Sequence, residues 1–244
     1  MKVMDTLNGK LAAGKLHMTL LDPEDQSPEE AAAISTAAVQ AGTDAIMLGG
    51  STGVTQELLD ATVAAIKKSV NVPVILFPTE AKAVSLKADA IYFMSLLNSR
   101  NPKFLLREQM KAAALIKKSG LEPISMGYII IEPGMRAGMV GEAELIKRTD
   151  LKSAIGYSVA GELLGMKLIY LEAGSGAPEP VPAALIQGVS RAIDIPLIVG
   201  GGIRSPEQAA QAVKAGADII VTGTIVEEEG ISEKFRAIVK AVKA

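Results

Sequence analysis

Two carboxylates stand directly after apolar runs of strand length, where an enzyme could place its chemistry. Asp22 follows the run 16–21, and Glu172 follows the run 168–171. A hard cation such as Mg2+ binds one or two carboxylates together with substrate phosphate oxygens, so Asp22 is a candidate metal ligand. Glu172 could accept a proton from a ligand hydroxyl. Asp22 could equally cap the turn before Pro23, and the sequence leaves both uses open.

Three small-residue loops follow apolar runs in the last third of the chain. They consist of Tyr170, Leu171, Glu172, Ala173, Gly174, Ser175 and Gly176, then Gly200, Gly201 and Gly202, then Gly223 and Thr224. Backbone N–H groups in such loops can close around an anion, and a helix behind the loop adds the positive end of its dipole. We therefore expect a phosphate ester at these loops. Tyr170 and Glu172 share one face of a strand, so phenol and carboxylate could hold a hydroxyl of the same ligand.

An earlier loop offers a second anion site. It follows the run 45–48 and consists of Gly49, Gly50, Ser51, Thr52 and Gly53. With Asp22 on the neighbouring strand end, this loop predicts a subsite for a diphosphate with Mg2+. The alternative is an ordinary glycine-rich turn in which Thr55 caps the next helix.

Other polar residues give weaker signals. Glu132 ends an apolar run, and Arg100 follows another; Arg100 could bind a phosphate or simply be solvated. His17, the only histidine, lies near the start of a run, so we interpret it as structural. No lysine stands at the C-terminal end of a run, which disfavours Schiff-base chemistry.

Composition excludes several classes of protein. The formal net charge of −2 provides no basic field for nucleic acid or anionic lipid. The chain has no cysteine, which excludes a disulfide framework and agrees with a reducing, cytoplasmic location. The apolar runs are too short to span a membrane, so we expect no integral membrane segment.

The apolar runs alternate with stretches of helical character. Eight runs lie at about 16–21, 45–48, 74–77, 90–94, 124–131, 168–171, 197–199 and 219–222. The stretches between and after them lie around 28–41, 55–69, 80–87, 102–119, 151–164, 181–193, 206–215 and 232–243. Alternating β and α elements predict a parallel sheet, and eight units in 244 residues predict an α/β fold, a (β/α)8 barrel formed by one domain, 1–244.

Local signals support this division. Ser27 and Ser205 each precede proline in a helix-start pattern, while Gly42 and Gly216 stand where a helix C-cap is wanted. The segment 38–46 resembles 212–220, which indicates a reused βα unit. The third helix, around 80–87, should be short or irregular, and the long loop 132–150 could act as a lid over the catalytic face.

These segments together resemble one known family, the geranylgeranylglyceryl phosphate synthases, the archaeal ether-lipid branch of phosphoglycerol prenyltransferases. The resemblance spans nearly the whole chain. It is carried by Leu-Leu-Asp-Pro at 20–23, Gly-Gly-Ser at 49–51, 93–99, 170–176, Gly-Gly-Gly-Ile at 200–203 and Gly223-Thr224.

The resemblance implies a Mg2+-dependent prenyltransferase with a modified TIM barrel. It would join sn-glycerol 1-phosphate to geranylgeranyl diphosphate and release diphosphate. The resemblance places Mg2+ at Asp22 and Ser51 and glycerol phosphate at 170–176, Gly201, Gly202, Gly223 and Thr224. In this chain Leu20 stands where some members have lysine, which resembles the branch whose members are often homo-oligomers, and Thr224 stands where some have asparagine.

Two other functions fit part of the pattern. A sugar-phosphate isomerase of the histidine or tryptophan pathways also uses late phosphate loops and could employ Asp22 and Glu132 as acid and base. It would need no elongated apolar channel, whereas a prenyl tail gains ~0.8 kcal/mol for each CH2 it buries. A silent phosphate-binding barrel would need neither Asp22 nor Glu172.

Overall fold

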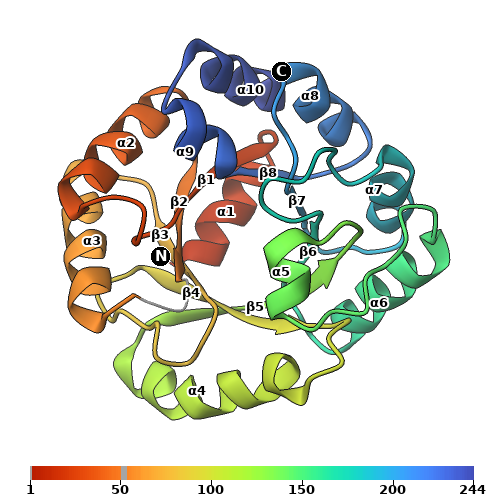
Figure 1. Ribbon diagram of the computed structural model, residues 1–244, viewed down its shortest axis with the longest axis horizontal. Helices are drawn as coiled ribbons and strands as arrows, with labels where there is room; N and C mark the ends of the chain where they lie inside the picture. The colour runs from red at the N-terminus through yellow and green to blue at the C-terminus, as the bar shows by residue number, and fades with distance from the viewer. Residues whose placement is uncertain (1, 51–53) are drawn as a thin grey trace.

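Eight parallel strands close into a barrel in the computed structural model, which describes residues 2–50 and 54–244. The strands are β1 (Leu16–Leu21), β2 (Ala45–Gly50), β3 (Val74–Pro78), β4 (Ala90–Leu96), β5 (Glu122–Ile130), β6 (Leu168–Glu172), β7 (Leu197–Gly200) and β8 (Ile219–Thr222). Each pairs with the next, and β8 pairs back with β1 (Figure 1). The predicted barrel is confirmed.

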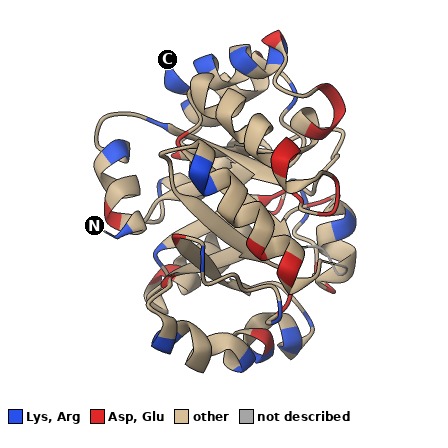
Figure 2. Cartoon of the chain, turned by 90° about the vertical axis from the view of Figure 1, so that its left-hand side faces the viewer, with Lys and Arg blue, Asp and Glu red and all other residues tan. Residues whose placement is uncertain are grey.

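Helices surround the barrel, mostly between successive strands (Figure 1). The helices are α1 (Val3–Leu11), α2 (Pro28–Gln40), α3 (Gln56–Ser69), α4 (Glu108–Ser119), α5 (Met135–Val140), α6 (Leu151–Leu163), α7 (Ala183–Ser190), α8 (Pro206–Lys214), α9 (Thr224–Glu229) and α10 (Glu233–Lys243), with a π-helical turn η1 (Lys103–Arg107) before α4. Charged residues of both signs are interspersed on the face seen in Figure 2. None of the helices formed by the described residues has the length and apolarity needed to cross a bilayer.

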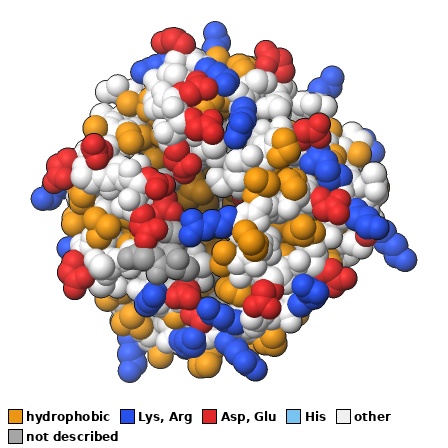
Figure 3. Space-filling model, viewed as in Figure 1, with side chains coloured by type: hydrophobic (Ala, Val, Ile, Leu, Met, Phe, Trp, Pro, Cys, Tyr) orange, Lys and Arg blue, Asp and Glu red, His pale blue; other side chains and the backbone are white. Residues whose placement is uncertain are grey.

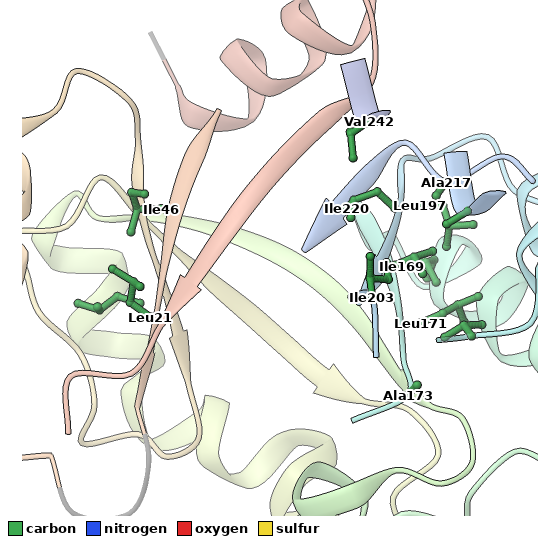
Figure 4. Close-up of a cluster of buried hydrophobic side chains, with 14 of the residues drawn as sticks. Leu21, Ile46, Ile169, Leu171, Ala173, Leu197, Ile203, Ala217, Ile220 and Val242 are labelled. Carbon is green, nitrogen blue, oxygen red and sulfur yellow. The ribbon is translucent and has the colours of Figure 1, made fainter. Parts of the chain in front are cut away.

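Alternating side chains divide the core into two layers. Along β6, Leu168 and Tyr170 point into the barrel, whereas Ile169 and Leu171 pack outward against the helices. Figure 4 shows part of the outer layer, where Ile169, Leu171, Leu197, Ile203, Ala217 and Ile220 gather. Tyr170 and Glu172 therefore both belong to the inner side of β6, as the period-two spacing predicts.

The third βα unit departs from the repeat. The helix expected around 80–87 does not form: the chain between β3 and β4 makes turns and bends only. Only about ten residues separate the two strands, too few for a helix of ordinary length with both its connections. Instead, Glu108 of α4 accepts a hydrogen bond from the Ala81 N–H at 2.9 Å, and Lys103 pairs with Glu80 at 3.0 Å. The outer face of β3 and β4 thus lacks its own helix.

The N-terminal segment adds a helix before the first strand. Residues 3–11 form α1, whose Leu7 is fully buried in the inner layer. Glu122, at the start of β5, accepts hydrogen bonds from the N–H groups of Val3 and Met4. This carboxylate satisfies two of the free N–H groups of the first turn. The helix thereby closes the end of the barrel opposite the loops singled out above.

The two repeated segments, 38–46 and 212–220, each contain an aspartate that joins neighbouring strands. Asp44 and Asp218 stand just before β2 and β8, and each accepts a backbone N–H of the adjacent strand, from His17 at 3.0 Å and Leu197 at 2.9 Å. Asp89, before β4, does the same with Val74 at 2.9 Å. Each aspartate also pairs with at least one lysine. The predicted glycine caps at Gly42 and Gly216 have φ of 108° and 113°, as a left-handed helix end requires.

His17 is structural, as predicted. Its ring is fully buried against Phe235, with Nδ1 2.9 Å from the Thr43 hydroxyl and Nε2 3.0 Å from the Thr222 hydroxyl. Burial lowers the pKa of His17 to about 3, an effect that Asp44 partly opposes. The imidazole is therefore neutral in the folded protein.

We predict that His17 makes stability depend on pH. Its folded pKa lies below its unfolded value of about 6.5, so between these values the unfolded chain binds more protons and stability falls as pH falls. From about pH 8 to about pH 5 the free energy of unfolding should drop by about 2 kcal/mol through this group. Urea titrations of wild type and His17→Gln measure the difference. An equal pH dependence in both proteins would contradict the prediction.

Candidate active site

A cavity of ≈ 370 Å³ opens at the ends of the strands that carry the predicted loops. Asp22, Glu172 and Ser175 line its polar part, and Figure 3 shows it as a hollow in the face of the barrel with acidic side chains beside it. The remaining wall is mainly apolar, with Phe77, Ile91, Tyr92, Phe93, Met94, Phe104, Ala112, Ile116 and Val140.

The cavity crosses the rim of the barrel. Tyr92 belongs to the inner layer of β4, whereas Ile91 belongs to the outer layer, and both line the same space. Ile116 of α4 lines it as well. This passage is possible because no helix forms between β3 and β4. The result is an elongated apolar groove that begins beside Glu172 and runs outward to α4, as an apolar ligand tail would need.

Glu172 is a buried carboxylate that accepts three hydrogen bonds. It is only 5% exposed, and its Oε1 accepts the Gly174 N–H at 2.6 Å. The hydroxyls of Tyr170 and Tyr128 also donate to it. Burial raises the pKa of Glu172, and these three hydrogen bonds oppose the rise. The group is thus a stronger base than an exposed carboxylate, held in one orientation.

The two tyrosines have different positions. Tyr170 is fully buried below Glu172 and does not line the cavity, whereas the ring of Tyr128 lines the cavity directly. Their ring centroids are 5.1 Å apart, and Phe77 lies edge-on to Tyr128 at 5.5 Å. Burial raises the pKa of both hydroxyls well above the ordinary value. Tyr170 was singled out from the sequence, whereas Tyr128 was missed. The available signal was the alternation along the apolar run 124–131, which places Tyr128 on the same face as Met126 and Ile130, near the end of the run.

The late loops converge as predicted. The Ser175 hydroxyl lies 2.7 Å from the Thr224 hydroxyl, which also accepts the Gly176 N–H at 3.1 Å. Gly223 and Thr224 thus adjoin the loop after β6. The side chains of Leu171 and Ala173 are buried in the outer layer, so these two residues can offer only backbone groups to a ligand.

The glycines of the loop after β7 make room for Glu172. A Cβ on Gly201 would lie 2.2 Å from Glu172 Oε1 and 2.6 Å from the Gly174 nitrogen, and its φ of 79° also favours glycine. A Cβ on Gly202 would lie 2.7 Å from the Glu179 carbonyl oxygen and 2.9 Å from the Pro180 nitrogen. The loops after β6 and β7 are therefore in direct contact.

Asp22 stands across the cavity at the end of β1. It is half-buried, and its Oδ1 accepts the Glu24 N–H at 3.1 Å, so the turn-capping interpretation is observed. Its other oxygen is not used by that bond. Burial raises the pKa of Asp22, and the neighbouring carboxylates Asp25 and Glu24 add to the rise, whereas Arg136 lowers it.

The second predicted metal ligand, Ser51, lies outside the described residues. In the ranges 2–50 and 54–244, no group of three or more His, Cys, Asp or Glu side chains is arranged to hold a metal ion. A cation here would therefore depend on Asp22 and on oxygens of a ligand.

Asp25, Glu227 and Arg136 were not singled out from the sequence as cavity residues. Asp25 and Glu227 line the cavity near Asp22, and burial followed by the charges of Asp25 and Asp22 raises the pKa of Glu227. Arg136 of α5 lines it as well. These residues come from three separate segments, so only folding brings them together.

Glu132 and Arg100 do not line the cavity. A carboxylate oxygen of Glu132 accepts the Arg148 N–H at 3.4 Å, and its own N–H donates to Ile146. Arg100 is exposed, and its N–H bonds the Glu142 carbonyl. The isomerase hypothesis, which needs Asp22 and Glu132 in one site, therefore loses its second residue.

The loop 132–150 is attached to the barrel by Asn98. Its buried amide donates to the carbonyls of Ile130 and Glu144 at 2.9 and 2.8 Å and accepts the Ile130 N–H at 3.0 Å. The Ser99 hydroxyl donates to the Gly141 carbonyl at 2.6 Å. The segment carries α5 and forms part of the cavity wall through Arg136 and Val140. Whether it moves as a lid stays a prediction.

Comparison with known proteins gives a consistent result. The sequence model of the PcrB family matches residues 9–242. The chain is 57% identical over 235 residues to geranylgeranylglyceryl phosphate synthase of Thermococcus kodakarensis, covering 96% of this chain and 93% of that protein. It is 56% identical over 235 residues to the synthase of Thermococcus gammatolerans, with the same coverage.

A crystal structure gives the same picture. The structure of (S)-3-O-geranylgeranylglyceryl phosphate synthase from Thermoplasma acidophilum, in complex with its substrate sn-glycerol-1-phosphate, superimposes with a TM-score of 0.96. The alignment covers 100% of this chain and 99% of that one at 44% identity. The resemblance seen in the motifs therefore extends over the full length of the fold.

We predict that Asn98→Ala lowers the free energy of unfolding by about 2–4 kcal/mol, because it leaves buried backbone groups of Ile130 and Glu144 without partners. Denaturant titration measures this. Asn8→Ala, at an exposed position of α1, is the matched control and should change stability by less than about 0.5 kcal/mol. Equal effects of the two substitutions would show that Asn98 does not hold the loop.

Proposed function

The chain belongs to the PcrB family, and we propose that it is a prenyltransferase that makes geranylgeranylglyceryl phosphate. It transfers the geranylgeranyl group from geranylgeranyl diphosphate to sn-glycerol 1-phosphate. The products are 3-O-geranylgeranyl-sn-glyceryl 1-phosphate, an intermediate of archaeal-type ether lipids, and diphosphate. Identities above 50% to relatives that carry this name, over nearly the full length, support the assignment.

One observation carries the proposal: a buried base and a phosphate-type loop cluster open into the same elongated apolar groove. Glu172 and Ser175 line the inner end, and Ile91 and Ile116 line the outer part. A small sugar phosphate would leave this groove empty. A prenyl chain lying in the groove would gain about 0.8 kcal/mol for each CH2 that it buries.

The loops after β6, β7 and β8 would bind the phosphate of glycerol phosphate. Gly174, Ser175, Gly201, Gly202 and Thr224 surround a small region with backbone N–H groups and two hydroxyls. Oriented N–H groups suit an anion and leave no bulky side chain between it and the protein. With its phosphate there, the glycerol part can reach Glu172, which the same loops contact.

Glu172 would hold and deprotonate the glycerol hydroxyl. As the bond between the allylic carbon and diphosphate breaks, the hydroxyl oxygen bonds to that carbon and its proton passes to the carboxylate. The hydrogen bonds from Tyr128, Tyr170 and Gly174 keep the carboxylate oriented and favour its ionised form. The apolar wall around Phe77 and Tyr128 excludes water that would compete as nucleophile.

Mg2+ is part of the proposal, with Asp22 and Ser51 as its protein ligands. The residues fit such an ion because Asp22, Asp25 and Glu227 repel one another at the cavity rim, and a divalent cation would relieve that repulsion. When bound, Mg2+ would neutralise charge on the departing diphosphate.

We also propose that the protein is a homo-oligomer in the cytoplasm. Leu106 and Met110 are 66% and 62% exposed, and Leu163 and Leu164 are 82% and 77% exposed. Adjacent large apolar side chains with this exposure are typical of subunit contacts.

The test is product formation from radiolabelled sn-glycerol 1-phosphate with C10, C15, C20 and longer prenyl diphosphates, with and without Mg2+. We expect Mg2+-dependent ether product, greatest with the C20 donor. Glu172→Gln should lower kcat by about 10²–10⁴, because the amide cannot accept the proton. Glu132→Gln is the matched control and should stay within about threefold of wild type. Absence of product with every donor would refute the proposed function.

Tyr128→Phe should move the acid limb of the pH profile of kcat/KM to higher pH. The Tyr128 hydroxyl lowers the pKa of Glu172 by a hydrogen bond, so its loss raises that pKa further, and the base is protonated at a higher pH. Tyr92→Phe is the control, because the Tyr92 hydroxyl contacts Met18 and not Glu172. A limb that stays in place, or moves to lower pH, would contradict the assigned role of Glu172.

A further inference from the structure

The charges that line the cavity are unbalanced. Its acidic residues are Asp22, Asp25, Glu80, Glu108, Glu172 and Glu227. Among the described residues that line it, Arg136 is the only one with a positive charge. A substrate with several negative charges must nevertheless enter this space. The position of Arg136 therefore decides where protein charge can meet that substrate.

The backbone that precedes Arg136 packs against the loop after β6, one of the predicted phosphate-binding loops. The Gly134 N–H donates to the Ala173 carbonyl at 3.0 Å. A Cβ on Gly174 would lie 2.6 Å from both the Gly134 carbonyl oxygen and the Met135 Cβ. Met135 has a φ of 45°, an uncommon left-handed conformation for a residue with a side chain. The first turn of α5 is thus fixed against the loop after β6.

The other end of α5 is fixed as well. The Ser99 hydroxyl bonds the Gly141 carbonyl, and the Ala143 N–H bonds the Gly138 carbonyl at 3.0 Å. Held at both ends, α5 presents Arg136 to the cavity together with Ala137 and Val140. Ala137 and Val140 belong to the apolar groove, and the charge of Arg136 acts on Asp22. Arg136 therefore lies where the groove meets the acidic rim.

We propose that Arg136 binds the diphosphate of the prenyl donor and of the released product, opposite Asp22. This inference rests on the proposed function, which supplies a donor with an apolar tail and an anionic head. A tail lying against Ala137 and Val140 places its head beside Arg136. The guanidinium can bind two phosphate oxygens at once, which holds the leaving group while the allylic bond breaks.

Glycerol phosphate is the other anion that Arg136 could contact. Its single phosphate would already have the backbone groups of the loops after β6, β7 and β8, whereas α5 presents Arg136 beside Ala137 and Val140 of the apolar groove. The proposal therefore assigns Arg136 to the donor, and steady-state kinetics with each substrate varied in turn distinguishes the two anions.

Arg136→Gln should raise KM for geranylgeranyl diphosphate about 10- to 100-fold and change KM for glycerol phosphate by less than about threefold. Arg136→Lys should recover part of the loss, since it keeps the charge but not the fork of two donors. Arg100→Gln, an exposed arginine outside the cavity, is the matched control and should leave both constants within about twofold. A larger rise in KM for glycerol phosphate, or no change in either constant, would overturn the proposal.

A binding measurement separates this inference from the proposed function. Calorimetry with inorganic diphosphate and Mg2+ should give a Kd about 10-fold weaker in Arg136→Gln than in wild type and Arg100→Gln. The weaker diphosphate binding is expected even if no prenyl donor yields product. In that case only the proposed function fails. Equal Kd values in all three proteins, or no diphosphate binding by wild type, would overturn the role of Arg136. Circular dichroism confirms that each variant is folded, and Arg136→Lys replaces Arg136→Gln if the latter is not.

Discussion

A carboxylate buried at the mouth of a closed barrel is the constraint on which the site depends. Removing a charge from water is costly unless hydrogen bonds replace its hydration. Glu172 is 5% exposed, and the Gly174 N–H and two tyrosine hydroxyls replace its water. Those tyrosines in turn need space: a Cβ on Gly200 would lie 2.2 Å from the Tyr170 hydroxyl, just as one on Gly201 would lie 2.2 Å from Glu172. Gly200 and Gly201, which belong to a loop that could bind an anion, are therefore also needed to leave room for Tyr170 and Glu172.

The open rim at β3 and β4 gives the barrel its groove. In a regular unit a helix would cover outward side chains such as Ile91 and Phe93. Here the short connection leaves them to line a cavity with inward side chains such as Tyr92. The connection is nevertheless held firmly, because Glu108 accepts the Ala81 N–H. One missing helix therefore changes a closed core into a groove without loosening the strands, since the ladder β2–β3–β4–β5 remains complete.

Local sequence signals predicted the elements well and their long-range contacts poorly. β1 and β8 begin and end where the apolar runs do, and Ser27 forms the capping box expected of it. These features depend on neighbours in sequence. The helix α1 depends on Glu122, more than a hundred residues away, and no local pattern announces such a partner. The same limit applies to the site. Asp22, Glu172 and the glycine loops follow strand ends and were predictable, whereas Tyr128 and Arg136 reach the cavity only through the pairing of β5 with β6 and the seating of α5.

The segment 93–99 shows how a family motif can serve a site without touching its ligand. It is one of the segments that carry the family resemblance, and an asparagine followed by serine after a strand suggests polar chemistry. Asn98 is instead 1% exposed and uses its amide for three backbone hydrogen bonds, while the Ser99 hydroxyl binds the Gly141 carbonyl. Both residues hold the loop that carries α5. A loop of this length would otherwise sample many positions, at an entropic cost when it orders around a ligand. The motif therefore contributes by fixing in advance the cavity wall that Arg136 and Val140 form.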